Sequence, residues 1–490
     1  GLERQDMSLV PEYGLPNPVT ALAGESTATT CKVVVCTIND PAVDTVSFIC
    51  NGVTYTDGVD FDTNMTAVGT DRGSLFTEAG WIGTLTVTGL PSAFQRFSWT
   101  VNQGSNSDSG SFTNSPAARD DFVLFAGTCD NNTNFSNQNN NHPWANVGYW
   151  RRIRELIETG NEPLCAGVLM IDDIMGYVDG KSVDDSDSSG HWATGIPQTT
   201  LKEYDYFLAW FAMLGMLGEN VDTTTTTNAD LVRIWGREES RAWCRKNMNW
   251  RVGYGDHELK SDFGWDFPVA APSALHATGT NKDGAGFVSY NTIFGAINPS
   301  AISGASDTLA NHWATDIGCV TVAYMDGITN SSTIGTISYG AAPTAIATLY
   351  GSNQIDDVLG ALNIEGTSFK IILAPLGMRY IMPEDINLGE NNSGTQHPIY
   401  NHTIAEYKQL FTADNNAGNP SIMDGVYTNG AKGTTIVLFG DHHVGMVQNH
   451  QSSADTNILE EQIYEFHLGT INGSINFNQQ SEIVSGYEFT

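Results

Sequence analysis

The sequence is poor in positive charge and poor in charged residues altogether. Its 490 residues include 22 lysines and arginines against 55 aspartates and glutamates, which gives a formal net charge of −33. Such a chain offers no basic footprint for nucleic acid or for an anionic membrane surface, so both partners are excluded. Its own field also repels phosphate anions, so chemistry on an anion would need local positive charge, most simply from metal ions.

Long hydrophobic runs are also missing. No segment reaches the roughly 18 apolar residues of a membrane helix, and the longest apolar run, residues 207–217, suits a buried helix. The chain begins with Gly1 and shows no signal peptide, so we expect a processed chain. Its polar but weakly charged surface predicts a secreted, extracellular or periplasmic protein. Seven Asn-X-Ser/Thr sequons agree and mark candidate glycosylation sites at Asn64, Asn131, Asn134, Asn330, Asn391, Asn401 and Asn472.

The cysteine count is odd. The seven cysteines are Cys31, Cys36, Cys50, Cys129, Cys165, Cys244 and Cys319. Outside the cell we expect disulfides, and an odd count leaves one cysteine without a partner in the same chain. That cysteine is either a buried thiol, a link to another chain, or a metal ligand. Its position favours Cys129 as the ligand, and the alternative for Cys129 is a disulfide with Cys165.

Residues 1–117 have the pattern of an all-β domain. Short alternating runs are separated by glycine, asparagine, aspartate and proline turns, which predicts a small β-sandwich. The strand candidates are residues 32–36, 45–49, 83–88 and 96–101. Residues 102–110 are predicted as a hairpin tip or loop, and residues 114–118 as a linker.

From residue 118 to residue 490 apolar strands alternate with helical segments, which predicts a layered α/β domain. The strand candidates are residues 122–126, 166–171, 249–254, 319–325, 369–374 and 434–439. The helix candidates lie at about 148–159, 200–217, 229–247, 352–363, 402–413 and 455–466.

Four of these strands end in side chains that can bind metal, and a fifth ends at Asp326. The four segments are Cys129-Asp130, Asp172-Asp173, Asp256-His257-Glu258 and Asp441-His442-His443. A single Asp or His after a strand usually caps a helix or closes a turn. Several such ends indicate a shared site, because ligands bind beyond the carboxyl ends of strands in α/β sheets. Carboxylates and imidazoles with one thiolate suit a hard or borderline transition metal beside a second cation.

At these residues the chain resembles the calcineurin-like metallophosphatases, and specifically the PhoD-like alkaline phosphatases. The similar segments occur in family order over most of the chain. They are Val87–Pro91 with Gly110–Pro116, Phe125–Asp130, Val168–Asp173, Thr200–Tyr204, Gly255–Glu258, Ala323–Asp326, Ser352–Gln354, Phe369–Met378 and Leu438–His443. The resemblance implies a leading immunoglobulin- or fibronectin-like sandwich, followed by an α/β metallophosphatase sandwich of two sheets between helices.

The resemblance also implies a site of two or more metal ions, Fe³⁺ with Ca²⁺, or zinc in their place. Carried over to this chain, one ion would be held by Cys129, Asp173, Tyr204 and His443. The second would be held by Asp173 as a bridge, with Asp256 and Asp441. His257 would contact a phosphoryl oxygen or the leaving group.

Several assignments have close alternatives, and some positions depart from the family pattern. Asp172 competes with Asp173, Tyr206 competes with Tyr204, and His442 is assigned to the rim. The tyrosine of the Gly-Asp segment comes one place late, at Tyr177, and the arginine expected after Asp326 is absent.

The expected function is that of a secreted metal-dependent phosphatase or phosphodiesterase, which hydrolyses small phosphate mono- and diesters with metal-activated water. The alternative is a catalytically degenerate extracellular glycoprotein on the same fold, structural or filament-forming, for which we expect self-association.

Overall fold

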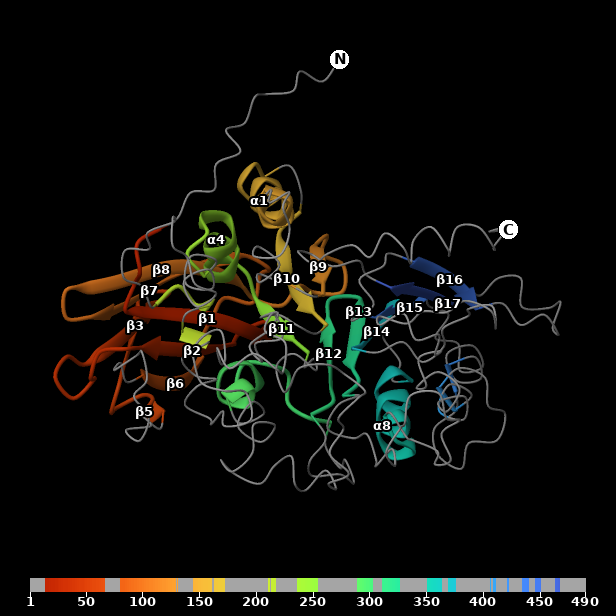
Figure 1. Ribbon diagram of the computed structural model, residues 1–490. Coiled ribbons are helices and arrows are strands. Elements are labelled where there is room, and N and C mark those ends of the chain that lie inside the picture. The colour runs from red at the N-terminus through yellow and green to blue at the C-terminus, as the bar shows by residue number, and fades with distance from the viewer. Residues whose placement is uncertain are drawn as a thin grey trace, which may run out of the picture.

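The computed structural model (Figure 1) describes the following parts of the chain: residues 14–66, 80–128, 130, 144–160, 163–171, 210–211, 213–216, 236–253, 289–302, 311–326, 350–363, 369–375, 406, 409–410, 421–422, 434–439, 446–450 and 463–467. Two antiparallel sheets lie at one end of the molecule. A parallel sheet and a mixed sheet follow toward the other end.

The two antiparallel sheets have four strands each. The first, in the order β1-β2-β6-β5, contains β1 (Val19–Ser26), β2 (Cys31–Thr37), β6 (Gly80–Val87) and β5 (Thr63–Thr66). The second, in the order β4-β3-β7-β8, contains β4 (Val53–Thr56), β3 (Val46–Cys50), β7 (Arg96–Gln103) and β8 (Asn106–Thr113). Side chains of both sheets share one buried core. The predicted β-sandwich is therefore present, while its immunoglobulin or fibronectin type stays a prediction.

One sheet of this sandwich is buried on both faces. Along β2, Val33 and Val35 point into the sandwich core, whereas Val34 and Cys36 belong to the larger core of the rest of the molecule. Successive side chains of a strand point to opposite faces, so this alternation puts apolar groups on both sides. The near-continuous run of apolar residues in β2 follows from that double burial.

Asn249 joins the sandwich to the parallel sheet. Its side-chain oxygen accepts hydrogen bonds from the Thr113 backbone N–H at 2.8 Å and the Thr113 hydroxyl at 3.1 Å. Its side-chain nitrogen donates to the carbonyl oxygens of Gly24 and Thr113, each at 3.0 Å. Its backbone carbonyl accepts from the Val168 N–H in the parallel sheet. One buried amide therefore satisfies backbone groups from both sides of the junction.

The α/β part contains two sheets. The parallel sheet has the order β11-β10-β9, with β9 (Val123–Gly127), β10 (Cys165–Met170) and β11 (Trp250–Val252). The mixed sheet has the order β12-β13-β14-β15-β17-β16, with β12 (Trp313–Ile317), β13 (Val320–Tyr324), β14 (Phe369–Ala374), β15 (Thr434–Phe439), β17 (Ile463–His467) and β16 (Met446–His450). Strands β13, β14, β15 and β17 are parallel, and β12 and β16 are antiparallel strands at its two edges.

Helices cover these sheets. α1 (Trp144–Glu158) contacts the parallel sheet through Trp150, whose ring centroid lies 5.6 Å from that of Trp250. α4 (Glu239–Asn247) packs against α1 and β8, and α8 (Ser352–Leu362) packs against β12 and β13. A short π-helix, η2 (Asn291–Gly295), contacts β11. In the described part of the chain, no helix combines the length and the apolar character needed to cross a membrane.

The six strands predicted after residue 118 are confirmed, and β14 and β15 have the predicted bounds. The predicted helix at 455–466 is wrong in its described part, because residues 463–467 pair with β15 and β16 as β17. Tyr464 and Phe466 alternate there with polar residues, which suits a strand. The hairpin tip predicted at 102–110 is confirmed, but it is confined to the turn at 104–105, since β7 extends to Gln103 and residues 106–113 form β8. Strands β12 and β16 were not predicted.

Replacing Asn249 with alanine should strongly destabilise the protein. The substitution leaves the Thr113 N–H and the Gly24 and Thr113 carbonyl oxygens without this partner, at a cost of about 3 kcal/mol in the free energy of unfolding. Urea unfolding followed by fluorescence measures the change. Asn64→Ala, at an exposed asparagine of β5, is the control and should change stability by less than about 0.5 kcal/mol. Equal stabilities of the two variants would contradict this role.

Candidate functional site

The predicted ligand segments begin directly after parallel strands. β9, β10 and β11 end at Gly127, Met170 and Val252, and β15 ends at Phe439. Cys129, Asp173, Asp256 and Asp441 follow these strand ends by two to four positions in the sequence. The strands of one parallel sheet present their carboxyl ends at the same edge, so the strands that precede these segments end at a common edge of their sheet.

The carboxyl edges of the two sheets meet at Gly253. Its N–H donates to the Met170 carbonyl oxygen, and the Ile171 N–H donates to the Gly127 carbonyl oxygen, so the three strands of the parallel sheet end in register. A Cβ atom on Gly253 would overlap the Ile171 carbonyl oxygen and would lie 2.6 Å from Cε2 of Tyr324, at the end of β13. The parallel sheet and the mixed sheet therefore touch where the ligand segments begin.

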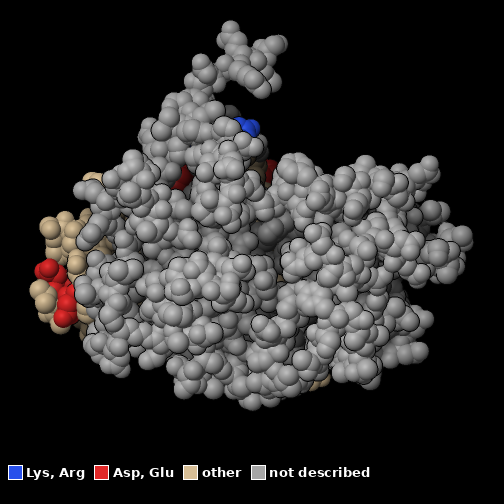
Figure 2. Space-filling view, viewed as in Figure 1, with Lys and Arg blue, Asp and Glu red and all other residues tan. Residues whose placement is uncertain are grey.

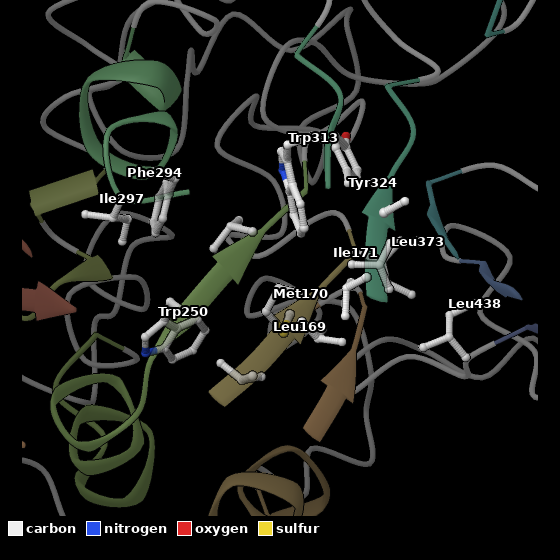
Figure 3. Close-up of a cluster of buried hydrophobic side chains, with 14 of the residues drawn as sticks. Leu169, Met170, Ile171, Trp250, Phe294, Ile297, Trp313, Tyr324, Leu373 and Leu438 are labelled. Atoms are coloured by element: carbon white, nitrogen blue, oxygen red, sulfur yellow. The ribbon is translucent and has the colours of Figure 1, made fainter. Parts of the chain in front are cut away.

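Buried apolar side chains fill the space between these strand ends. Figure 3 shows Ile171, which follows β10, lying beside Leu373 of the mixed sheet, and Met170, Tyr324 and Leu438 belong to the same buried core. The Trp313 ring stacks on Tyr324 with their centroids 5.6 Å apart. This packing fixes the spacing of the two edges, because well-packed interiors resist displacement.

The site residues predicted from the sequence lie outside the described residues. These are Cys129, Asp173, Tyr204, Asp256, His257, Asp441 and His443. Their chemistry fits a metal pair, since carboxylates and imidazoles with one thiolate and one phenolate are donors for hard and borderline ions. The strands of the parallel sheet that precede these residues end in register, next to the end of β13 in the mixed sheet.

Asp130, the residue next to Cys129, is a structural residue. Its carboxylate is buried and forms an ion pair with Arg241 of α4, with 2.8 Å between Oδ2 and Nε. Its second oxygen accepts a hydrogen bond from the indole N–H of Trp150 at 3.3 Å. In the pair Cys129-Asp130, the carboxylate thus anchors the segment to α1 and α4. Cys129 remains the residue of this pair predicted to bind metal.

Asp326, at the end of β13, is held through its backbone. Its N–H donates to the side-chain oxygen of Gln354 at 2.5 Å, and its carbonyl oxygen accepts from the side-chain nitrogen of Gln354 at 2.9 Å. Gln354 lies in the first turn of α8 and also donates to the Tyr350 carbonyl oxygen. The Asp326 carboxylate accepts from the Asn311 N–H at 3.3 Å. The sequence pointed to Asp326 and Gln354, but it gave no signal for Asn311.

Val252, the last residue of β11, is held in the same way by Asn298. The Val252 N–H donates to the Asn298 side-chain oxygen at 2.9 Å, and the Asn298 side-chain nitrogen donates to the Val252 carbonyl oxygen at 2.7 Å. The Tyr290 hydroxyl donates to the same carbonyl oxygen. Sequence reasoning missed Asn298 and Tyr290, because nothing in their neighbourhood along the chain connects them to β11.

The expected disulfides are not found among the described cysteines. Cys31, Cys36, Cys50, Cys165, Cys244 and Cys319 are free thiols. The disulfide between Cys129 and Cys165 is therefore absent. Burial raises the pKa of the Cys36 thiol to about 12 and that of Cys165 to about 11, and it also raises the pKa of Cys31 and Cys244. Thiols of this kind react slowly, because the thiolate is the reactive form.

Alkylation of the native protein with iodoacetamide at pH 7.5, without a reducing agent, should leave these four buried thiols unmodified. Raising the thiol pKa above the working pH suppresses the thiolate, and burial also blocks access. In urea, still without reductant, all four should be modified, as read by peptide mass spectrometry. Cysteines that become modified in urea only after reduction would contradict the free-thiol state.

The sequon asparagine Asn64 is exposed on the edge strand β5, where a glycan could be attached. The other six sequon asparagines lie outside the described residues.

Comparison with known proteins gives a similarity of fold. No family model matches the sequence, and no curated protein matches it. PhoD is similar in structure, with a TM-score of 0.54 and 11% identity over 95% of this chain and 79% of that chain. The purple acid phosphatase PPD1 from yellow lupin (Lupinus luteus) seeds gives 0.48 and 13% identity over 94% and 66%.

A 5′-nucleotidase from Candida albicans gives a TM-score of 0.29 and 10% identity over 72% of this chain and 46% of that chain. The scores of the phosphatase from lupin and of the nucleotidase are too low to carry an argument about fold, whereas PhoD matches along almost the whole chain. The resemblance predicted from the sequence motifs is therefore confirmed at the level of architecture: this chain has the fold of PhoD.

Proposed function

We propose that this protein is a metal-dependent phosphoesterase that acts outside the cell on small phosphate mono- and diesters. One observation carries the proposal: strands that precede metal-competent segments end at one place, in a chain with the fold of PhoD. Strand ends that converge in this way would bring Cys129, Asp173, Asp256 and Asp441 within reach of the same ions.

The residues divide into two ligand sets in this proposal. Cys129, Tyr204 and His443 would hold a trivalent ion, with iron as the first choice, because thiolate and phenolate donors stabilise it. Asp256 and Asp441 would hold a divalent ion, calcium or zinc. The Asp173 carboxylate would be a ligand of both ions.

When bound, the two cations would supply positive charge for the phosphoryl oxygens and would make a water molecule acidic enough to serve as the nucleophile. The imidazole of His257 would donate a proton to the departing alkoxide oxygen, which makes it a better leaving group.

The net negative charge of the protein makes bound metal ions the most direct source of positive charge at such a site. Figure 2 shows acidic side chains at the visible end of the sandwich, away from the mixed sheet. With a net charge of −33, long-range attraction does not deliver a phosphate ester to the protein. Asp326 is followed by Gly327, so the arginine expected there by family resemblance is missing as well. The binding of the phosphoryl group would therefore depend on the metal ions more strongly than in relatives with that arginine.

The test is metal content together with turnover. The purified protein should contain bound iron with calcium or zinc, and it should hydrolyse a chromogenic phosphomonoester or diester. His257→Ala should lower kcat by about 10²–10⁴-fold, because the leaving group loses its proton donor. His450→Ala is the matched control. β16 pairs His450 with Ile463, the first residue of β17, so His450 lies at the edge of the mixed sheet opposite to the carboxyl end of β17. Chelation should abolish turnover, and a metal-free protein that stays inactive after metals are added would contradict the proposal.

A second candidate function is structural, as an extracellular glycoprotein that assembles into filaments. The observation in its favour is the edge strand β4, where Val53 is 46% exposed, together with the exposed residues Val43 and Val59 in the same sandwich. An exposed apolar edge strand is a template for pairing with another chain.

If β4 mediates assembly, light scattering should show a particle mass that rises with protein concentration, and electron microscopy should show regular polymers. Val53→Lys should abolish both, because a charge on an edge strand disfavours pairing. Particles of constant monomer mass at every concentration would contradict this function.

A further inference from the structure

Val252 lies at an edge of the parallel sheet, and a side chain takes the place of a neighbouring strand there. Among the described strands, β11 is the outermost of the order β11-β10-β9, so the outward N–H and carbonyl groups of Val252 have no partner in any of these strands. Asn298 bonds to both groups, and Tyr290 adds a third bond. Asn298 and Tyr290 are buried, so these bonds are shielded from competing water.

Asn298 is in turn held by the N-terminal sandwich. The ammonium group of Lys32 in β2 donates to the Asn298 carbonyl oxygen at 2.7 Å. The Glu25 N–H in β1 donates to the carbonyl oxygen of the preceding residue, Ile297, at 2.7 Å. Lys32 also forms an ion pair with Glu25 at 2.9 Å. A continuous set of hydrogen bonds therefore runs from the sandwich through Asn298 to the end of β11.

The end of β11 leads directly to the predicted metal-ligand segment. Gly253 follows Val252 and lies against Ile171 and Tyr324, and Asp256 and His257 come three and four positions after Gly253. The direction in which the chain leaves β11 is thus set at Val252 and Gly253. A shift of Val252 along the strand direction would move the point from which this segment starts.

We propose that Asn298 is a positioning residue for Asp256, and that the N-terminal sandwich acts on the metal centre through Lys32 and Asn298. This inference rests on the proposed function. Residues that orient a metal ligand without touching the metal usually change metal affinity or activity by about 10–100-fold when replaced. The N-terminal sandwich would then be part of the construction of the site and not a separate module.

The experiment measures metal binding in two variants of the full chain. Asn298→Ala removes both bonds to Val252, and Lys32→Met removes the contact that holds Asn298. In separate calorimetric titrations with Ca²⁺ and Zn²⁺, we expect the Kd of the ion bound by Asp256 to rise about 10–100-fold in Asn298→Ala, and by a smaller factor in Lys32→Met. Turnover should fall at low metal concentration and recover with excess metal.

Each variant has a matched control. Lys246 has the same 28% side-chain exposure as Lys32 and forms an ion pair of the same 2.9 Å length, with Asp108, but it has no contact with Asn298. Asn114 is a buried amide that donates to the carbonyl oxygens of Ala28, Pro91 and Ala93, within the sandwich. Lys246→Met and Asn114→Ala should lose stability to a similar degree as their counterparts, with unchanged metal affinity.

Failure of this inference is distinguishable from failure of the proposed function. A wild-type protein that binds neither metal and shows no turnover overturns both. A second outcome is that the wild-type protein binds metal and turns over substrate while Asn298→Ala and Asn114→Ala have the same metal affinity. That result overturns the positioning role alone. If Asn298→Ala does not fold, Tyr290→Phe, which removes one bond to Val252, and Lys32→Met decide the question by the same titrations.

Discussion

The hydrogen bonds of Asn249 are the constraint on which the rest of the architecture depends. This amide binds Thr113 and Gly24 in the sandwich, while its own backbone carbonyl belongs to the parallel sheet. The position of β11 relative to the sandwich follows from it, and the positions of β10 and β9 follow from their pairing with β11. In a buried junction, leaving a backbone group without a hydrogen bond costs more free energy than forming the bond gains, so this arrangement is strongly specified.

The same device recurs at other places where a ladder of backbone hydrogen bonds stops. Asn298 binds the N–H and carbonyl groups of Val252, and Gln354 binds those of Asp326. Each amide carries one acceptor and donors on one planar group, which matches the N–H and carbonyl groups of one extended residue. Two of the strand ends near the candidate metal centre, those of β11 and β13, are thereby held by side chains.

The sequence predicts the parts of the fold that depend on local pattern. The apolar runs at 369–374 and 434–439 are strands because a parallel strand buried on both faces needs such a run, and α8 follows from its helical period. β17 was predicted as a helix because its pairing with β15 and β16 lies in tertiary contacts. The amides of Asn298 and Asn249 could not be predicted, since their partners lie 46 and 136 positions away in sequence. The ligand assignments stay predictions that the strand ends support.

Gly253 has a consequence for how such a centre can change. Its missing side chain lets the backbone at the end of β11 lie against the Ile171 carbonyl of its own sheet and against the Tyr324 ring of the mixed sheet. The distance between the two carboxyl edges at this point is then set by the thickness of a peptide backbone. One added methyl group at residue 253 would push the two edges apart. A centre built between these edges would therefore keep its width for as long as residue 253 stays glycine.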